Sequence, residues 1–371
     1  MNSPTSKNTH YISIDILRAI AFLLVFLYHA EHLSRDANTS TFYIVDKIIS
    51  SIGSIGWIGV DIFFCISGFL ITRVLINGDF TQHNIRTFWI SRAARILPAY
   101  YFFLVVTLTF NTFIATVIDT GGAKIPTLAY FTFTSNIYSF FQEANAPKPF
   151  SIIWSLCVEE QFYIIWPILF LLFSKNLRAV CWIAITASIV AKYLVYTNSQ
   201  NIMPVYVSMF TRIDGLMYGA LTCLYLSKQT LPKLNIDKLI VIPFIFSGLY
   251  YFNGMLPLAK LTITPVISYF LLATTIQLNF KKIGRELENK LKPLTFTLLA
   301  IGRNSYALYL WHLLILMLIA PLIKTDIYTL KYTLLVTIGL SISYAISRVS
   351  WHLIEAPCLD FKNKFRNRST S

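Results

Sequence analysis

The stretch IDILRAIAFLLVFLYHAEHL, residues 14–33, is largely apolar, yet it contains Arg18 and His29. Its length is about that of a helix that crosses the hydrocarbon core of a bilayer. Arg18 and His29 are eleven positions apart. This distance advances a helix by about 16 Å and about 1100°, so both side chains lie on one face at different depths. A charged side chain at bilayer depth costs at least about 2.5 kcal/mol. We therefore predict that this stripe belongs to an intramembrane active site or conduction path; the alternative is that each side chain snorkels to the nearer interface.

The whole chain has the composition of a membrane protein. Of its 371 residues, 56% are hydrophobic and 13% are charged, and apolar stretches long enough to cross a bilayer recur along it. No small-residue cleavage site follows the first stretch, so we expect it to remain as a span rather than to be removed as a signal peptide. We predict one transmembrane domain over residues 1–371, with no appended soluble domain.

The basic residues predict the topology. In a soluble protein the formal net charge of +14 would suggest nucleic-acid binding, but these residues gather in short connections between apolar stretches. If each cluster lies in the cytoplasm, two spans must separate it from the next, and the apolar stretches supply two every time. The fold expected is an all-α polytopic integral membrane protein with about ten transmembrane helices and both termini cytoplasmic. The predicted spans are residues 12–33, 52–76, 96–117, 151–173, 179–197, 204–227, 238–254, 259–280, 294–322 and 331–357.

The long outer connection, residues 118–150, contains an apolar segment that is not predicted to be a span. Its segment 125–141 is apolar, but counting it as a span would break the charge pattern, so we expect it to lie in the membrane interface or to re-enter. The five cysteines lie in or at the ends of spans without paired spacing. This favours buried apolar side chains over a disulfide framework or a metal site.

Asp61 is the one acid of the second span, where Gly59 and Gly68 permit close helix contact. An intramembrane carboxylate needs a partner. By chain order the nearest candidate is a cation of the first span, Arg18 or His29. A purely structural ion pair is the alternative.

Two adjacent acids, Glu159 and Glu160, stand near the start of the fourth span. They project about 100° apart on a helix, so one should face the polar interior and the other the outer interface, and the sequence does not choose between them. Glu159 shares a helix face with Tyr163. In the tenth span Arg348 and Glu355 are seven residues apart, which favours a structural pairing within or between helices.

Two further pairs stand at helical spacing. Arg92 and Arg95, at i and i+3, share a face just ahead of the third span, where they either anchor to anionic lipid or clamp phosphate groups, which guanidinium forks match well. Ser305 and His312 share a face of the ninth span nearly two turns apart. They are too far from each other for a direct hydrogen bond, which excludes a local nucleophile–base pair.

Six motifs follow one another along nearly the whole chain. They are Arg18-X10-His29, Gly59-Val60-Asp61-Ile62-Phe63-Phe64 with Ser67-Gly68-Phe69-Leu70, Arg92-Ala93-Ala94-Arg95-Ile96-Leu97-Pro98, Trp154-Ser155-Leu156 with Tyr163, Ser305-Tyr306 with Trp311-His312, and Glu355-Ala356-Pro357. In this order they resemble the membrane acyltransferase-3 family, whose bacterial members O-acylate surface glycans. The resemblance implies that family's ten-helix core. Two positions depart from the pattern: Cys157 stands where serine or alanine is more usual, and Ala356 replaces a basic residue.

The resemblance also implies an activity, that of a membrane O-acyltransferase in the bacterial cytoplasmic (inner) membrane. Its donor would be cytoplasmic acyl-CoA, most often acetyl-CoA, and its acceptor a hydroxyl of a cell-surface or lipid-linked polysaccharide. Matching positions would make His29 the catalytic residue, Arg18 its essential companion, and Arg92 and Arg95 donor-binding residues. The other motif residues expected to line the site are Asp61, Ser67, Trp154, Glu159, Glu160, Tyr163, Ser305, His312 and Glu355. No metal or nucleic acid is expected.

Two mechanisms remain open for His29. It acts as a general base, because imidazole titrates near neutral pH, or it carries the acyl group as an acyl-histidine. Arg18 would orient the site or offset charge on the tetrahedral intermediate, and Asp61 or an intramembrane glutamate would hold the imidazole tautomer. The predicted topology puts Arg92 and Arg95 inside and His29 in the outer half of its span, so the donor would reach His29 from the cytoplasm and the acceptor from outside.

A different class of protein would place the same residue types along a transmembrane path. A glycan or small-molecule exporter also carries intramembrane Arg, His, Asp and Glu. No inverted repeat or pair of broken helices in corresponding halves is evident in the sequence, which counts against a transporter. A catalytically inactive membrane scaffold would tolerate loss of His29, and nothing in the chain argues for one.

Overall fold

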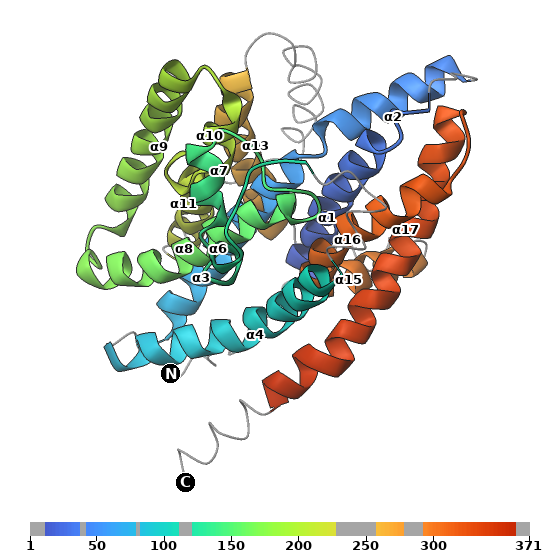
Figure 1. The fold of residues 1–371 in the computed structure, drawn as a ribbon. Coiled ribbons are helices and arrows are strands. Elements are labelled where there is room, and N and C mark those ends of the chain that lie inside the picture. Colours follow the sequence, from blue (N-terminus) through green and yellow to red (C-terminus); the bar gives the residue numbers. More distant parts are fainter. Residues whose placement is uncertain are drawn as a thin grey trace.

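The computed structural model describes residues 12–37, 42–78, 82–110, 121–227, 257–277 and 292–360. The regular elements in these ranges are helices, and they pack as a bundle in which α9 (Leu177–Ser199) and α17 (Tyr328–Ser350) lie on opposite sides (Figure 1). Seven helical segments of the described ranges are long and apolar enough to cross a membrane. The predicted fold class, an all-α polytopic membrane protein, is confirmed.

Most predicted spans correspond to a described helix. The first, second, fourth, fifth, sixth and eighth are α1 (Ile12–His32), α3 (Ile58–Asn77), α8 (Ile153–Leu172), α9, α11 (Met209–Ser227) and α13 (Pro257–Gln277). Shorter elements precede three of them: α2 (Tyr43–Ile55), the 3-10 turn η1 (Phe150–Ile152) and α10 (Ile202–Val207). The predicted span at 238–254 lies outside the described residues.

The remaining helices differ from their predicted spans in ways that shape the site. The helix expected at 96–117 is α4 (Gln82–Thr109), which begins earlier and therefore carries Arg92 and Arg95 within it. The span expected at 294–322 is interrupted at Asn304, giving α15 (Lys292–Arg303), α16 (Ser305–Ile319) and the 3-10 turn η4 (Ala320–Leu322). Asn304 Nδ2 donates to the Ala300 carbonyl oxygen at 2.7 Å, the kind of local bond that competes with continued helix.

The apolar segment ahead of the fourth span forms two short helices, α6 (Thr127–Phe131) and α7 (Ser135–Phe141). Neither is long enough to cross a bilayer, in agreement with the expectation that this segment does not span. Helix α7 packs against α8 and α10. The connection therefore packs against the bundle instead of extending away from it.

Helix α3 lies in the interior of the bundle and packs against α1, α8, α11 and α13. Two of its glycines allow this. A Cβ atom on Gly59 would stand 2.2 Å from the Ala21 carbonyl oxygen of α1, and one on Gly68 would stand 1.8 Å from the Leu216 carbonyl oxygen of α11. The predicted role of Gly59 and Gly68 in close helix contact is confirmed, since any larger residue would push these backbones apart.

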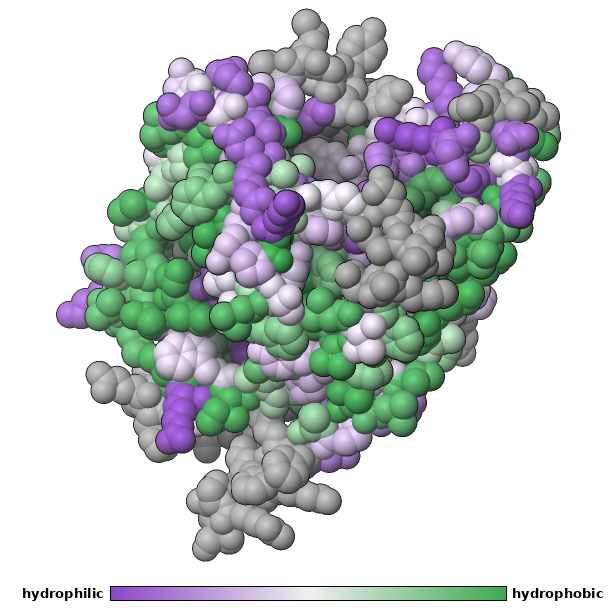
Figure 2. Space-filling model, in the orientation of Figure 1, coloured by the Kyte–Doolittle hydropathy of each residue, from purple (hydrophilic) through white to green (hydrophobic). Residues whose placement is uncertain are grey.

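The outer surface is apolar where a bilayer would contact it. Large hydrophobic side chains such as Ile183 and Ile164 are exposed at 68% and 56%. Figure 2 shows hydrophobic side chains across the middle of the visible face, with hydrophilic ones gathered toward its upper and lower ends. This distribution suits a protein whose middle faces hydrocarbon and whose two ends face water.

Candidate active site

A cavity of about 840 Å³ opens between α1, α3, α4, α8, α16 and the segment that follows α17. Its walls include nine of the residues that the sequence predicts for the site: Arg18, Ser67, Arg92, Arg95, Glu159, Glu160, Tyr163, Ser305 and Glu355. These residues come from six separate parts of the chain. The structure therefore brings most of the predicted site into one space, and four predicted residues, His29, Asp61, Trp154 and His312, are not among the lining residues.

Helix α4 forms one wall of the cavity, and hydrogen bonds to main-chain oxygens hold it against α8 and α16. Trp89 Nε1 donates to the Tyr163 carbonyl oxygen of α8 at 2.9 Å, and the Tyr306 hydroxyl of α16 donates to the Ile96 carbonyl oxygen at 3.0 Å. Between these two anchors lie Arg92 and Arg95. Both guanidinium groups are thereby held at the cavity wall on a fixed length of helix.

The cavity carries more guanidinium groups than carboxylates. Arg18, Arg92, Arg95 and Arg303 line it, together with Glu159, Glu160 and Glu355. Arg303 lies 3.5 Å from Asp15 and its side chain is 59% exposed, whereas the other three arginines form no ion pair with the described residues. The cavity thus has arginine donors available to an anionic ligand.

The expectation that Glu159 and Glu160 face opposite surroundings is wrong, because both line the cavity. The two carboxylates still project about 100° apart on their helix, but the cavity extends around that side of α8 and receives both. The Tyr163 hydroxyl donates to Glu159 Oε2 at 3.5 Å and also forms a short hydrogen bond with the Ser67 hydroxyl. Ser67 and Tyr163 therefore link α3 to α8 beside Glu159.

The two histidines of the predicted site face each other. His29 of α1 and His312 of α16 have ring centroids 5.3 Å apart, with an interplanar angle of 47°. Tyr309, which does line the cavity, lies with its ring 5.4 Å from that of His312, and its hydroxyl is 2.8 Å from the Ser155 hydroxyl. Tyr309 and Ser155 thus stand between the cavity and the histidine pair. Neither the contact of His29 with His312 nor the position of Tyr309 and Ser155 beside it was predicted from the sequence.

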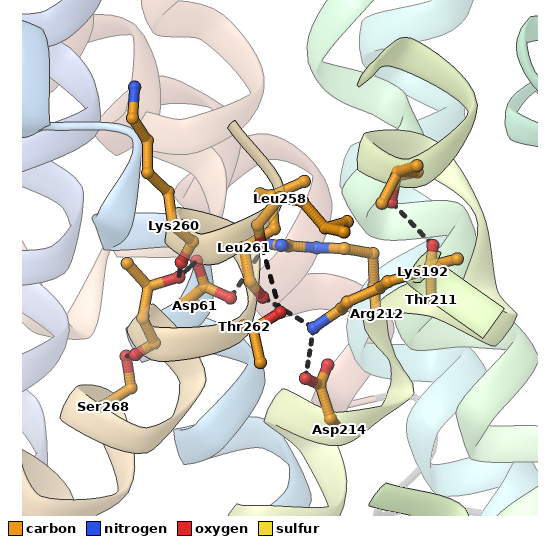
Figure 3. A network of polar contacts seen from close by, with 12 residues as sticks. Asp61, Lys192, Thr211, Arg212, Asp214, Leu258, Lys260, Leu261, Thr262 and Ser268 are labelled. Atoms are coloured by element: carbon orange, nitrogen blue, oxygen red, sulfur yellow. Dashed lines mark hydrogen bonds and ion pairs between the residues drawn. The ribbon is translucent and has the colours of Figure 1, made fainter. Parts of the chain in front are cut away.

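The predicted pairing of Asp61 with Arg18 or His29 is wrong. Figure 3 shows Asp61 directed toward Arg212 of α11, whose Nη2 lies 2.8 Å from Asp61 Oδ1. The Thr264 hydroxyl donates to the other carboxylate oxygen at 3.0 Å. The close approach of α3 and α11 at Gly68 explains the difference, because it brings a cation of α11 nearer than either cation of α1. Asp61 is consequently occupied and does not hold the His29 tautomer.

Arg212 also organises Trp154, which explains why that residue lies away from the cavity. The guanidinium carbon is 5.8 Å from the ring of Trp154, 5.8 Å from Phe64 and 5.5 Å from Tyr206. These are cation–π distances. The aromatic rings and Asp61 together enclose a guanidinium that is wholly buried.

A second buried ion pair lies beside that of Asp61 and Arg212. Lys192 of α9 forms a short ion pair with Asp214 and donates to the Leu261 carbonyl oxygen at 2.6 Å (Figure 3). No role was predicted from the sequence for Lys192, Arg212 or Asp214. The signal was present, since each is a charged residue inside an apolar span, the same property that marked Asp61.

The expected Arg348–Glu355 pairing is also wrong. Helix α17 ends in a π-helical turn, η5 (Trp351–Glu355), whose i to i+5 hydrogen bonds alter the direction of the side chains beyond it. Arg348 Nη2 lies 2.9 Å from His352 Nε2, and Glu355 accepts a hydrogen bond from the Ser350 hydroxyl at 3.4 Å. The π turn thereby turns Glu355 into the cavity.

No group of three or more His, Cys, Asp or Glu side chains within the described ranges is placed to hold a metal ion. The cysteines of those ranges are free thiols: Cys65, Cys157, Cys181, Cys223 and Cys358. The polar groups that line the cavity are guanidinium, carboxyl and hydroxyl groups. Such a set suits an organic anion with polar functions.

The helical membrane fold and this polar cavity agree with a family assignment that covers most of the chain. The model of the acyltransferase domain matches residues 11–348, and the chain belongs to that family. The resemblance inferred from the six motifs is thereby confirmed.

Among known proteins the chain is similar to the peptidoglycan O-acetyltransferase OatA of Listeria monocytogenes, with 28% identity over 99% of this chain and 58% of the relative. It is also similar to the O-acetyltransferase OatA of Staphylococcus aureus, with 29% identity over 81% of this chain and 49% of the relative. The chain spans about half the length of these curated relatives. No solved structure matches it.

Proposed function

We propose that this protein is an O-acetyltransferase of the bacterial cytoplasmic membrane, which moves an acetyl group from cytoplasmic acetyl-CoA to a hydroxyl of a cell-surface or lipid-linked glycan. The observation that carries the proposal is the cavity itself. Its walls hold Arg18, Arg92 and Arg95, and they also hold Tyr309, which contacts His312 of the histidine pair. A candidate phosphate-binding region therefore lies in the same cavity as Tyr309, which connects it to the histidine pair that contains the candidate base.

The donor assignment rests on the arginines. Coenzyme A carries a diphosphate and a further phosphate, and a guanidinium presents a planar fork of donors that matches phosphate oxygens. Arg92 and Arg95 lie on one face of α4 at the cavity wall, and Arg303 lies exposed at the start of the break before α16. We assign these three side chains to the phosphates of the donor. The glutamates of the same cavity would balance the arginine charges when no donor is bound.

The position of His29 supports its assignment as the catalytic residue. Arg18 lines the cavity, and His29 follows it by eleven residues on the unbroken helix α1, or about 16 Å along the axis. A donor whose phosphates lie at the arginines would extend its acetyl-bearing arm along α1 toward His29. The topology predicted from the basic clusters then puts the phosphates on the cytoplasmic side and His29 nearer the outer side, where a glycan would arrive.

The proposed reaction is general base catalysis by His29 of an attack on the thioester of acetyl-CoA. A ring nitrogen of His29 takes the proton of the acceptor hydroxyl, and the oxygen attacks the thioester carbonyl carbon. The carbon–sulfur bond of the resulting tetrahedral intermediate breaks, and the departing sulfur of coenzyme A receives the proton from His29. Arg18 would offset the negative charge that develops on the intermediate. The products are an O-acetyl ester and free coenzyme A.

The exporter alternative is not favoured, because the chain belongs to an acyltransferase family. A polysaccharide acceptor is supported by the name of the Listeria relative, which refers to peptidoglycan. Comparison of surface glycans by mass spectrometry, from cells with and without this protein, tests the acceptor class. Loss of acetyl esters from a glycan fraction is the expected result, and identical acetylation in both strains would refute the proposed function.

Donor binding is tested on the purified protein with coenzyme A. Arg92→Ala should weaken coenzyme A binding by about 1.5–3 kcal/mol, the contribution of a charge-assisted hydrogen bond. Arg178→Ala is the matched control: the guanidinium carbons of Arg92 and Arg178 each lie 5.7 Å from an aromatic ring, Phe88 and Tyr225 respectively, but Arg178 is not a lining residue of the cavity. Equal affinities of the two variants would show that Arg92 contacts lipid rather than the donor.

A further inference from the structure

His312 lies in a closed, largely aromatic surrounding, whereas its neighbour His29 is half-buried. His312 is wholly buried, and the rings of Phe22 and Phe26 lie 5.8 Å and 6.3 Å from its own. The His29 ring is 5.3 Å away. The other ring neighbour of His312 is Tyr309, at 5.4 Å, so the imidazole of His29 is the nitrogen-bearing ring beside His312.

The tautomer of His312 follows from its hydrogen bond. Its Nδ1 lies 2.7 Å from the Tyr309 carbonyl oxygen. A carbonyl oxygen only accepts, so Nδ1 carries the proton, and in a neutral imidazole the other nitrogen, Nε2, then has a free lone pair. Nε2 is buried and has no hydrogen-bond partner among the described residues. A buried acceptor without a partner is unfavourable, which indicates that this nitrogen is satisfied in another state of the site.

We infer that His312 is a positioning residue for His29: its Nε2 accepts a hydrogen bond from one N–H of His29 and leaves the other nitrogen of His29 unprotonated toward the acceptor hydroxyl. This inference rests on the proposed role of His29 as the base. A centroid separation of 5.3 Å lets a modest rotation of either ring bring two nitrogens within hydrogen-bond distance. Catalytic hydrogen bonds are often long in the free enzyme and shorten when the substrates bind.

A neutral partner suits this position better than a carboxylate does. In the familiar catalytic triads a buried acid holds the histidine tautomer and stabilises the imidazolium. Here Asp61 is already paired with Arg212, and a bare carboxylate among Phe22, Phe26 and His312 would carry a large desolvation penalty. A series of hydrogen bonds from the Tyr309 carbonyl oxygen through His312 to His29 would orient the His29 ring in the same way, and His312 would remain uncharged.

The transfer step balances with this arrangement. When His29 removes the hydroxyl proton it becomes an imidazolium, and the lone pair of His312 Nε2 remains hydrogen-bonded to the N–H that already faced it. His312 neither gains nor loses a proton overall. When the sulfur of coenzyme A leaves, it takes the transferred proton back from His29, and both histidines return to their starting state.

The test compares two substitutions of His312 in purified, lipid-reconstituted protein. His312→Leu removes the acceptor at the Nε2 position, whereas the amide oxygen of His312→Gln replaces it. We expect His312→Leu to lower kcat by about 100-fold, within the range for impaired general base catalysis, with the KM for acetyl-CoA and the affinity for coenzyme A unchanged. His312→Gln should recover a large part of that loss, which a role in packing alone would not produce.

The pH profile of kcat gives a second readout. Other titratable groups that face His29 are Tyr28 and His32 of α1 and Lys148 of the connection before α8. His32→Gln is therefore the control, since His32 is exposed one turn beyond His29. We expect the limb of the profile that reports the base to move in both His312 variants and to move less in His32→Gln, because water screens the charge of the exposed His32.

Each outcome has a separate meaning. If His312→Leu keeps the parent kcat and pH profile while His29→Ala is inactive, the positioning role is refuted and the proposed function stands. If both His312 variants lose coenzyme A binding together with activity, His312 is structural and the inference is likewise refuted. If His29→Ala retains normal acetyl transfer, the proposed role of His29 itself fails.

Discussion

Removal of the Asp61 carboxylate should destabilise the fold rather than the chemistry. Asp61 and Arg212 are paired at 2.8 Å with side chains 1% and 0% exposed. Asp61→Ala leaves the buried guanidinium without its ion-pair partner, a change that costs about 3–5 kcal/mol. Loss of the 3.0 Å hydrogen bond from Thr264 adds about 1 kcal/mol.

Two further variants isolate the cause. Replacing both partners, Asp61→Leu with Arg212→Met, removes the two charges together, and such replacements are often neutral or stabilising. We expect this double variant to regain the parent stability and to transfer acetyl groups. Asp36→Ala is the control for a half-exposed pair: Asp36 lies 2.6 Å from Lys331 and is 69% exposed, whereas Lys331 is 7% exposed, so loss of Asp36 should cost less than loss of the fully buried Asp61.

The assay is equilibrium unfolding of the purified protein in detergent, combined with acetyl transfer by the fraction that remains folded. A loss of stability in Asp61→Ala no larger than that in Asp36→Ala would refute the reasoning. So would a stable double variant that transfers no acetyl group, because Asp61 would then act at the reacting centre, as the sequence had suggested.

Three other predictions concern packing, catalysis and topology. Gly68→Ala should lower the unfolding midpoint strongly, because its Cβ would stand 1.8 Å from the Leu216 carbonyl oxygen, whereas Gly78→Ala, with 3.4 Å to its nearest atom, should not. Arg18→Lys should lose most acetyl transfer and keep its fold, since an ammonium lacks the planar fork; full activity would leave Arg18 with a purely electrostatic role. In a background without native cysteines, an impermeant thiol reagent should label Gln142→Cys on intact cells and Lys175→Cys only after permeabilisation, both positions being exposed; the opposite pattern would overturn the predicted topology.

The transmembrane helices could be located from the sequence, but the break within one of them could not. Hydropathy located α1, α8, α9 and α13 to within a few residues, because each is a continuous apolar run with polar ends. The break at Asn304 went unpredicted, since an apolar run continues on both sides of it. That break depends on a local hydrogen bond and on the contact of Gly302 with the Asp15 backbone of α1, neither of which appears in a hydropathy pattern.

For the site, the sequence by itself identified the residue types that a membrane chain retains at a cost: Arg18, His29, Asp61, Glu159 and His312. The energetic penalty of polar groups in hydrocarbon makes them conspicuous in any apolar run. It is a property of each residue alone, so it is readable without a structure.

Only the tertiary structure decided which of these residues meet. It paired Asp61 with Arg212 instead of Arg18, opposed His29 to His312, and turned both Glu159 and Glu160 toward one cavity. The physical reason is that the partner of a buried polar side chain depends on which helices pack side by side and how closely. For Asp61 the deciding contact is that of α3 with α11 at Gly68. Helices that are far apart in the chain and alike in hydropathy carry no local mark of which neighbour they will have.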